Sequence, residues 1–541
     1  MIIRLLLVIL ITIGGVGYCS DEGTYIEGRV FNDINQNLLY DAGEDGIKGV
    51  KVSNGVDIVT TNRSGKYKIP VTEDTVVFVI KPNGWATPLD ENNLPLFYHI
   101  HKPYGSKTFS YEKYKHFDGV APTKIVTKVD FPLFEQKEPD EFKVLLFGDT
   151  QPRNQKEINY IAHDVVEELI GTDCDFGITL GDNVFNNLSL HSSLIQTIGN
   201  INIPWYYVIG NHDHNFDVPE DKYAQETFER FLGPPYYSFD YSSVHFIVMD
   251  DIVWLGAETG KYDPGLGENQ LEFIQNDIAL VPEDNLIVIL MHIPLDNESW
   301  MADDREKLFS ILEKRKNCLA IAAHEHVQSF RFLGEKDNWH GENKLLLIVN
   351  GTVCGSWWSG APDELGIPHT TMRDGAPNGY AYLTCKGNQY SWVYKAARRP
   401  ADYQMNIYAP ESIDIKDANE TEVLVNVFGG SGKSVVEMKV GDDGEWLPME
   451  KTKRIDPQYQ KLVEQNKDKE FNWSSPGRDI PKASECRHLW AAKLPENSPT
   501  GSQLISVRTT DMFGNKYNGC RIIRITGEQQ EDVKDIKIKT W

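Results

Sequence analysis

The stretch WYYVIGNHD occupies residues 205–213 and joins a short apolar segment to four residues of a different kind. Its first part, Trp205–Ile209, is apolar and aromatic, which is typical of a buried strand. Gly210-Asn211-His212-Asp213 follows directly, so side chains that can bind metals or move protons stand where the strand ends. Open α/β sheets bind their ligands at the carboxyl ends of strands. The stretch therefore indicates a layered α/β domain with a site at one sheet edge.

Four further motifs repeat this arrangement along the chain. They are Gly148-Asp149-Thr150-Gln151, Gly181-Asp182-Asn183, Met291-His292 and Ala323-His324-Glu325-His326. Each motif alone is weak evidence for a functional site, because a short Gly-Asp-Asn segment is usually a turn and a lone histidine is usually structural. Five such motifs in order, mostly after apolar strands, are hard to produce by chance.

The rest of residues 140–395 alternates apolar strands with helical stretches, which predicts an α/β layered domain. The expected strands are Val144–Phe147, Phe176–Leu180, Trp205–Ile209, His245–Met249, Leu286–Leu290, Leu319–Ala322 and Leu345–Val349. The expected helices are Gln155–Ile170, Asn269–Ile278 and Arg305–Glu313.

Taken together, the five motifs resemble the calcineurin-like metallophosphoesterase superfamily, whose pattern is D-x-H, G-D-x-x, G-N-H-[DE], a later His and G-H-x-H. The resemblance covers most of residues 143–330. It implies two mixed β-sheets packed face to face and flanked by helices, with the site at the carboxyl ends of the strands. It also implies a phosphoric ester hydrolase, in which two divalent ions clamp the phosphoryl group and activate a water.

The resemblance assigns a role to each motif residue. Asp182 would bridge the two ions. One ion would take Asp149, Gln151, Asp182 and His326, and the other would take Asp182, Asn211, His292 and His324. His212 would act as general acid or steady the charge on the phosphate, and Asp213 would orient His212.

Two positions depart from the pattern. Gln151 stands where the pattern has His, and an amide oxygen is a harder ligand than an imidazole. That change favours manganese, iron or magnesium over zinc, with manganese or iron preferred. Ala323 replaces a glycine, which is a small change. The alternative for the whole set is a decayed site that is kept only as a scaffold.

Residues 351–379 are rich in Gly, Pro, Trp and charge, and they follow the strand after His326. Trp357 and Trp358 are expected to stack on a sugar or base, and Arg373 to hold a phosphate oxygen. The alternative is that the two tryptophans pack against the C-terminal domain.

The flanking regions indicate β-domains. Residues 24–135 contain short alternating strands at 49–52 and 66–69, and the segment 28–67 resembles prealbumin-like or Cna-B-like sandwiches. From about residue 400 to 541, alternation at 423–428, 435–440 and 504–508 predicts a C-terminal β-sandwich.

The loop 33–44 has the oxygen spacing of an EF-hand-type calcium loop. The side chains concerned are Asp33, Asn35, Asn37, Asp41 and Glu44. Leu38 stands at the position of the usual glycine, so an Asx-rich turn is the alternative to a structural calcium ion.

The first 19 residues are typical of a signal peptide, with a short apolar run after Arg4 and a loose lipobox that ends at Cys19. We therefore expect an exported protein, periplasmic or a surface lipoprotein, whose membrane contact is an N-terminal lipid anchor. The alternative is ordinary cleavage with loss of Cys19. Six further cysteines are scattered, which permits one or two disulfides or buried free thiols.

The net charge of −25 argues against a broad nucleic-acid-binding surface. The function expected first is a phosphomonoesterase that acts on small phosphorylated metabolites. The alternatives are a phosphodiesterase or nucleotide pyrophosphatase and, from another class, a catalytically inert surface protein that binds glycans.

Overall fold

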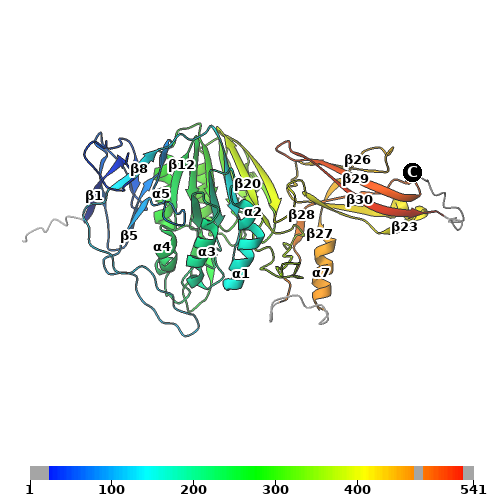
Figure 1. The fold of residues 1–541 in the computed structure, drawn as a ribbon, viewed down its shortest axis with the longest axis horizontal. Helices are drawn as coiled ribbons and strands as arrows, with labels where there is room; N and C mark the ends of the chain where they lie inside the picture. Colours follow the sequence, from blue (N-terminus) through cyan, green and yellow to red (C-terminus); the bar gives the residue numbers. More distant parts are fainter. Residues whose placement is uncertain (1–23, 468–478, 528–541) are drawn as a thin grey trace, which may run out of the picture.

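The computed structural model describes residues 24–467 and 479–527, so the predicted signal peptide and lipobox lie outside the described residues. From left to right in Figure 1, an N-terminal pair of sheets, a central α/β domain and an elongated C-terminal β-domain follow one another. None of the described helices combines the length and apolarity that crossing a membrane requires.

The first sheet of the central domain has the strand order β11-β10-β9-β20-β21. Its strands are β9 (Glu141–Phe147), β10 (Phe176–Leu180), β11 (Trp205–Val208), β20 (Gly379–Lys386) and β21 (Gln389–Ala396). β9, β10 and β11 run parallel, whereas β20 pairs antiparallel with β9.

The second sheet has the order β12-β13-β16-β17-β19-β18. Its strands are β12 (Tyr237–Tyr241), β13 (Val244–Val248), β16 (Leu286–Leu290), β17 (Cys318–Ala322), β18 (Ser329–Leu333) and β19 (Leu345–Val349). The four inner strands are parallel, and β12 and β18 are antiparallel edges. A small hairpin of β14 (Ile252–Trp254) and β15 (Tyr262–Pro264) lies outside both sheets.

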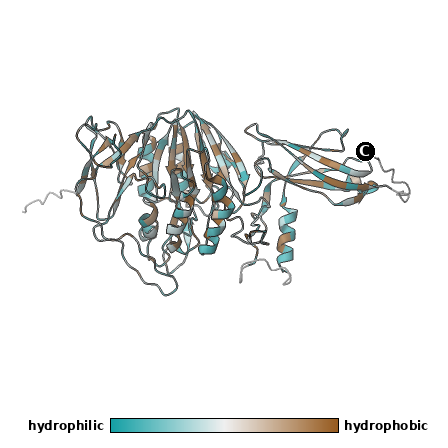
Figure 2. Cartoon of the chain, in the orientation of Figure 1, coloured by the Kyte–Doolittle hydropathy of each residue, from teal (hydrophilic) through white to brown (hydrophobic). Residues whose placement is uncertain are grey.

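Alternation within the strands explains how the layers stack. Val144 and Leu146 of β9 belong to the core between the two sheets. Leu145 and Phe147 belong to the core between the first sheet and its helices. The helices packed on the first sheet are α1 (Gln155–Ile161), α2 (Glu167–Leu169), α3 (His191–Gly199) and α4 (Glu226–Leu232). Those packed on the second are α5 (Gly267–Ile278) and α6 (Ala302–Leu312). Figure 2 shows the apolar residues concentrated on the central strands, and the predicted fold of two mixed sheets flanked by helices is confirmed.

The helix expected over 155–170 contains a π-helical turn. Asn154 caps α1 by accepting the backbone N–H of Glu157, and residues 162–166 between α1 and α2 form the π turn. The carboxylate of Asp164, in that turn, pairs with Arg398 at 2.6 Å. The turn thus connects the helix layer to the chain that leads into the C-terminal domain.

Two four-stranded sheets make up the N-terminal region, with the orders β4-β1-β8-β6 and β3-β2-β5-β7. The strands are β1 (Tyr25–Asn32), β2 (Lys51–Ser53), β3 (Ile58–Thr60), β4 (Lys66–Pro70), β5 (Thr75–Ile80), β6 (Trp85–Ala86), β7 (Tyr98–His101) and β8 (Phe131–Glu135). The region has its own apolar cluster, but Phe78 and Ile80 join the central core instead. Buried Lys81 also pairs with Glu138 at 2.6 Å. The N-terminal sheets are therefore packed into the central domain.

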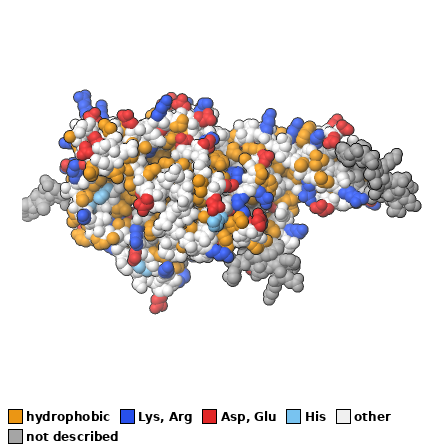
Figure 3. All heavy atoms as spheres, viewed as in Figure 1, with side chains coloured by type: hydrophobic (Ala, Val, Ile, Leu, Met, Phe, Trp, Pro, Cys, Tyr) orange, Lys and Arg blue, Asp and Glu red, His pale blue; other side chains and the backbone are white. Residues whose placement is uncertain are grey.

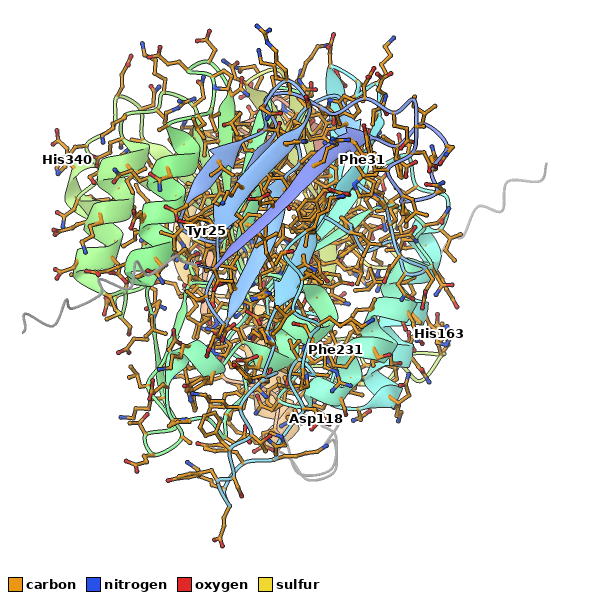
Figure 4. The ribbon with its side chains drawn as sticks, turned by 90° about the vertical axis from the view of Figure 1, so that its left-hand side faces the viewer. Tyr25, Phe31, Asp118, His163, Phe231 and His340 are labelled. Atoms are coloured by element: carbon orange, nitrogen blue, oxygen red, sulfur yellow. The ribbon has the colours of Figure 1, made fainter. Side chains whose placement is uncertain are left out.

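A long segment without strands, residues 102–130, runs from the N-terminal sheets along the central domain. Lys102 is buried and pairs with Glu226 and Glu229 of α4 at 2.5 and 2.6 Å. Figure 4 shows the N-terminal strands across this side of the molecule and Asp118 just below Phe231 of α4.

Two further sheets form the C-terminal domain, in the orders β22-β24-β28-β27 and β23-β30-β29-β25-β26. The elements are β22 (Met405–Tyr408), β23 (Ser412–Asp414), β24 (Glu422–Val427), β25 (Val435–Val440), β26 (Leu447–Pro448), β27 (Glu450–Ile455), α7 (Pro457–Lys467), β28 (Glu485–Lys493), β29 (Gly501–Thr510) and β30 (Lys516–Thr526). Alternate residues of β25 and β29 are buried in a separate apolar cluster.

The six described cysteines are free thiols, four of them buried, so the described chain holds no disulfide. In the loop 33–44 the oxygen side chains accept hydrogen bonds from within the loop; Asp33, for example, accepts the backbone N–H of Asn37 and Leu38 at 3.2 and 2.7 Å. The calcium ion stays a prediction.

On the face drawn in Figure 3, acidic and basic side chains are interspersed.

Candidate metal centre

The predicted ligands follow five strands of the two central sheets. Asp149, Asp182 and Asn211 follow β9, β10 and β11; His292 follows β16; and His324 and His326 follow β17. Parallel strands present their carboxyl ends at the same edge of a sheet. Because the two sheets pack face to face, they bring these side chains to one place.

Asp182, His292 and His324 form the densest group, with one ligand atom of each within 4.8 Å of the others. Nε2 of His292 lies 3.3 Å from Oδ1 of Asp182 and 3.1 Å from Nδ1 of His324. Oδ1 of Asn211 is also 3.1 Å from Nε2 of His292. The four residues expected around one ion are therefore together.

Asp149 and His326 lie beside this group, with Oδ2 of Asp149 at 3.2 Å from Nε2 of His326. Gln151 is near both groups, but it turns its amide nitrogen toward Oδ2 of Asp182 at 2.7 Å and its oxygen toward Sγ of Cys354 at 3.8 Å. Binding of an ion through the Gln151 oxygen therefore needs the amide to rotate by half a turn, and that ligand stays a prediction.

Hydrogen bonds behind two of the imidazoles fix how the rings face the centre. Nδ1 of His292 donates to the backbone oxygen of Leu180 at 2.9 Å, and Nδ1 of His326 donates to the backbone oxygen of Gly355. With Nδ1 protonated in each ring, Nε2 carries the lone pair that faces the centre. This is the usual support of a metal-binding histidine.

The donor set fits divalent cations. Asp149 and Asp182 are almost completely buried, and each lies beside a histidine ring. Burying carboxylates is costly unless positive charge compensates them. Burial lowers the pKa of His292, but Asp182 outweighs it and raises that pKa to about 10. Because a ligating imidazole is neutral, a cation at Nε2 would displace a proton.

The backbone around the ligands is strained. Gln151, Asp182, His324 and His326 have φ values of 44°, 48°, 67° and 54°, in the left-handed region that non-glycine residues rarely adopt. Such strain collects at functional sites, where the surrounding structure has to hold it. Gly210 permits a close approach here, because a Cβ on it would lie 2.1 Å from the backbone nitrogen of Asp182.

His212 lies at the edge of this group, and about 23% of its side chain is exposed. Its Nε2 is 4.0 Å from Oδ2 of Asp182, and its Nδ1 donates to Oδ1 of Asn186. The ring of Phe185 stacks on it at 4.4 Å. Burial lowers the pKa of His212, whereas the charge of Asp182 opposes that shift. His212 can therefore present one ring nitrogen to a molecule bound at the centre.

Asp213 does not orient His212, which corrects the sequence prediction. Its buried carboxylate accepts the backbone N–H of Asn183, Val184 and Gly210 at 2.9 to 3.1 Å. Asp213 therefore ties the turn after β10 to the turn after β11. Asn186 orients His212 instead. The sequence gives no signal for this role, because an asparagine in a polar turn usually has only a structural part.

Asp251 is a further residue of the site that the sequence analysis missed. It is fully buried and accepts the backbone N–H of His292 and Ile293 at 3.1 and 2.7 Å. Burial raises its pKa to about 6, against the opposing charge of His292. Its position just after the largely apolar strand β13 is the signal that could have found it.

Only one of the two tryptophans stacks on a predicted metal ligand. The ring of Trp357 stacks on His326 at 3.8 Å, whereas Trp358 is 1% exposed and belongs to the core under the first sheet. Trp358 therefore has no face for a substrate, which corrects that prediction, and its packing partners lie in the central domain. Nε of Arg373 donates to the backbone oxygen of Lys482 at 3.2 Å, so its contact with phosphate stays a prediction.

Comparison with known families gives three matches in chain order. Residues 34–115 match the N-terminal part of calcineurin-like phosphoesterases, residues 142–328 match the calcineurin-like phosphoesterase domain, and residues 348–517 match the C-terminal part. All the motif residues from Asp149 to His326 fall inside the middle match.

Three individual proteins are also similar to parts of the chain. Purple acid phosphatase 3 of Arabidopsis thaliana is 37% identical over 86 residues, which are 14% of this chain and 23% of that protein's length. A dimetal phosphatase structure from Danio rerio is 13% identical with a TM-score of 0.33, over 47% of this chain and 98% of that one. A purple acid phosphatase from yellow lupin (Lupinus luteus) seeds is 14% identical with a TM-score of 0.34, over 64% and 66%.

Proposed function

Since the chain belongs to the calcineurin-like phosphoesterase family, we propose that it is a two-metal phosphomonoesterase that acts on small phosphorylated metabolites. The observation that supports this proposal most is the group of Asp182, His292 and His324, with the pair of Asp149 and His326 beside it. Asp182 lies between the two sets and is the natural bridge.

The proposed ligand sets are those that the motif pattern of the family implies. One ion would be held by Asp149, Gln151, Asp182 and His326, and the other by Asp182, Asn211, His292 and His324. Two divalent cations supply charge that stabilises the phosphoryl oxygens and a water-derived nucleophile at neutral pH.

Other residues of the chain act on the proton and on the geometry. His212 protonates the leaving-group oxygen through Nε2, while Asn186 holds the opposite ring nitrogen. Phe185 fixes the plane of the ring by stacking on it. Asp251 holds the turn that carries His292.

The proposal is tested with the full chain, stripped of metal and then reconstituted with manganese, iron, magnesium or zinc. We expect metal-dependent hydrolysis of a chromogenic aryl phosphate monoester, and slower hydrolysis of the matching diester. Faster cleavage of the diester would favour the phosphodiesterase alternative. No metal-dependent hydrolysis of either substrate would favour the inert binding protein.

The bridge is tested by Asp182→Asn, which removes the charge shared by both ions. We expect turnover to fall by roughly 10²- to 10³-fold and the metal content on purification to fall with it. Asp443→Asn, at an exposed turn of the C-terminal domain, is the matched control and should leave both unchanged. Near-normal turnover of Asp182→Asn would disprove the two-metal proposal.

We further propose that the protein is exported and anchored through a lipid on Cys19, on the basis of its N-terminal sequence. Labelling of cells with radioactive palmitate should mark the wild-type protein and not Cys19→Ala. Equal labelling of the two would contradict the anchor.

A further inference from the structure

The segment of residues 351–379 makes three contacts that hold His326 from behind. The backbone oxygen of Gly355 accepts from its Nδ1, and the ring of Trp357 lies on its ring at 3.8 Å. The backbone N–H of Arg373 donates to the backbone oxygen of His326 at 3.1 Å. The direction of Nε2 of His326 therefore depends on how this segment is held.

The C-terminal domain holds the same segment at its start. The hydroxyl of Tyr459, on α7, hydrogen-bonds Oγ of Ser356 at 2.9 Å and donates to the backbone oxygen of Pro481 at 3.0 Å. Tyr459 is 1% exposed and Ser356 is 1% exposed, so water does not compete for this contact. Ser356 is the direct neighbour of Gly355.

A second attachment lies at the other end of the segment. Nε2 of His488, on β28, lies 2.9 Å from Oδ2 of Asp374, and both side chains are fully buried. The same carboxylate oxygen accepts the backbone N–H of Gln328 at 2.6 Å, two residues after His326. On the next strand, Nδ2 of Asn426 donates to the backbone oxygen of Asp374 at 3.1 Å. One carboxylate thus connects the C-terminal domain to the turn that carries His326.

We propose that the C-terminal β-domain positions the metal ligand His326, through the contacts of Tyr459 with Ser356 and of His488 with Asp374. This inference rests on the proposed function, because it takes His326 as a metal ligand. The residues concerned touch neither substrate nor metal. Groups that orient a ligand from behind change metal affinity by roughly 10- to 100-fold when they are removed. A domain that merely packs on its neighbour would change stability without changing metal affinity.

The test compares Tyr459→Phe with the wild type as full-length, metal-depleted proteins titrated with Mn²⁺ by calorimetry. The substitution removes one hydroxyl and keeps the ring, which packs with Ile480 and Ala483. We expect roughly tenfold weaker Mn²⁺ binding, with lower kcat at saturating Mn²⁺ and unchanged KM. Tyr517→Phe, partly buried in the far sheet of the same domain, is the matched control and should bind Mn²⁺ as the wild type does.

His488→Gln supplies the second arm. The amide of Gln can donate to Asp374 in place of Nε2, so we expect His488→Gln to retain more Mn²⁺ affinity than His488→Leu, which removes the donor from the C-terminal domain. Wild-type Mn²⁺ affinity in Tyr459→Phe and His488→Leu would overturn the inference, with thermal unfolding used to confirm that both are folded. If the wild type binds Mn²⁺ but hydrolyses no ester, the proposed function fails while the positioning role is still measured.

Discussion

At the scale of single residues, His212 and Asp213 are neighbours with unrelated tasks. The ring of His212 faces the centre and Asn186, whereas the carboxylate of Asp213 points into the protein and accepts backbone N–H groups of two turns. Burial and the nearby Asp182 raise the pKa of Asp213 to about 7, which fits a group placed for structure rather than for charge.

His212→Ala should retain both metals and lose roughly 10²- to 10⁴-fold in kcat for esters with poor leaving groups. The loss should shrink for aryl esters, whose leaving groups need no proton. Burial holds the pKa of His212 below 6.5, and a general acid works in its protonated form, so turnover should fall as pH rises through that lowered pKa. A pH profile of kcat should show this limb in the wild type and lack it in the variant.

His163→Ala is the matched control, because His163 is exposed in the π turn between α1 and α2, where it pairs with Glu167 (Figure 4). An equal loss for all leaving groups in His212→Ala would show that His212 steadies phosphate charge instead of donating a proton.

Gln151→His tests the metal preference. The native amide oxygen should favour manganese or iron, and an imidazole should move the preference toward zinc. The measurement is activity after reconstitution with each metal, and Gln155→His on the exposed face of α1 is the control. If zinc reconstitutes the wild type best and the substitution changes nothing, Gln151 does not bind metal through its oxygen.

At the scale of elements, the site depends on how abruptly each strand ends. The last four residues of β10 and of β17 are buried, and the chain then enters left-handed turns at Asp182, His324 and His326. The turn after β11 comes so close to the turn after β10 that only glycine fits at position 210. The functional side chains are therefore placed by the ends of a rigid sheet rather than by a long loop.

Gly210→Ala should disrupt two turns at once. Its Cβ would lie 2.1 Å from the backbone nitrogen of Asp182 and 2.5 Å from Oδ1, so the backbone has to move. We expect a loss of about 1–3 kcal/mol in the free energy of unfolding and a measurable loss of bound metal. Gly432→Ala, where a Cβ meets nothing within 4 Å, should change neither quantity in thermal unfolding and metal analysis. Normal metal content in Gly210→Ala would contradict the close approach.

At the scale of the whole molecule, the three parts are joined unequally. Several apolar residues of the N-terminal sheets enter the central core. The C-terminal domain keeps an apolar core of its own; it adds Phe428 to the central core and also meets the central domain through buried polar contacts. We therefore expect the first two parts to unfold together.

Phe78→Ala tests that coupling. Phe78 is 1% exposed on β5 and lies edge-on to Phe273 of α5 at 5.6 Å, so truncation should cost about 3–5 kcal/mol. Calorimetry should show a lower melting temperature for the transition that bound metal stabilises. Val425→Ala, in the C-terminal core, should leave that transition in place. An unchanged metal-stabilised transition in Phe78→Ala would show that the N-terminal sheets fold independently.

Much of the central domain could be predicted from the sequence. Strands such as Leu286–Leu290 and Phe176–Leu180 coincide with β16 and β10, because a run of apolar residues has no stable place outside a covered sheet. The motif residues were predictable for a related reason, since few arrangements other than a metal site place Asp, Asn and His at so many strand ends.

By itself, the sequence determined the layered α/β domain, its family and the side chains that meet at the sheet edge, because these depend on residue type and on periodicity along the chain. Only the tertiary structure decided that Asn186 rather than Asp213 orients His212, that Trp358 is buried while Trp357 covers His326, and that the C-terminal domain holds the segment behind His326. These outcomes depend on the direction of each side chain in a turn and on packing between residues far apart in the chain, and local sequence patterns specify neither.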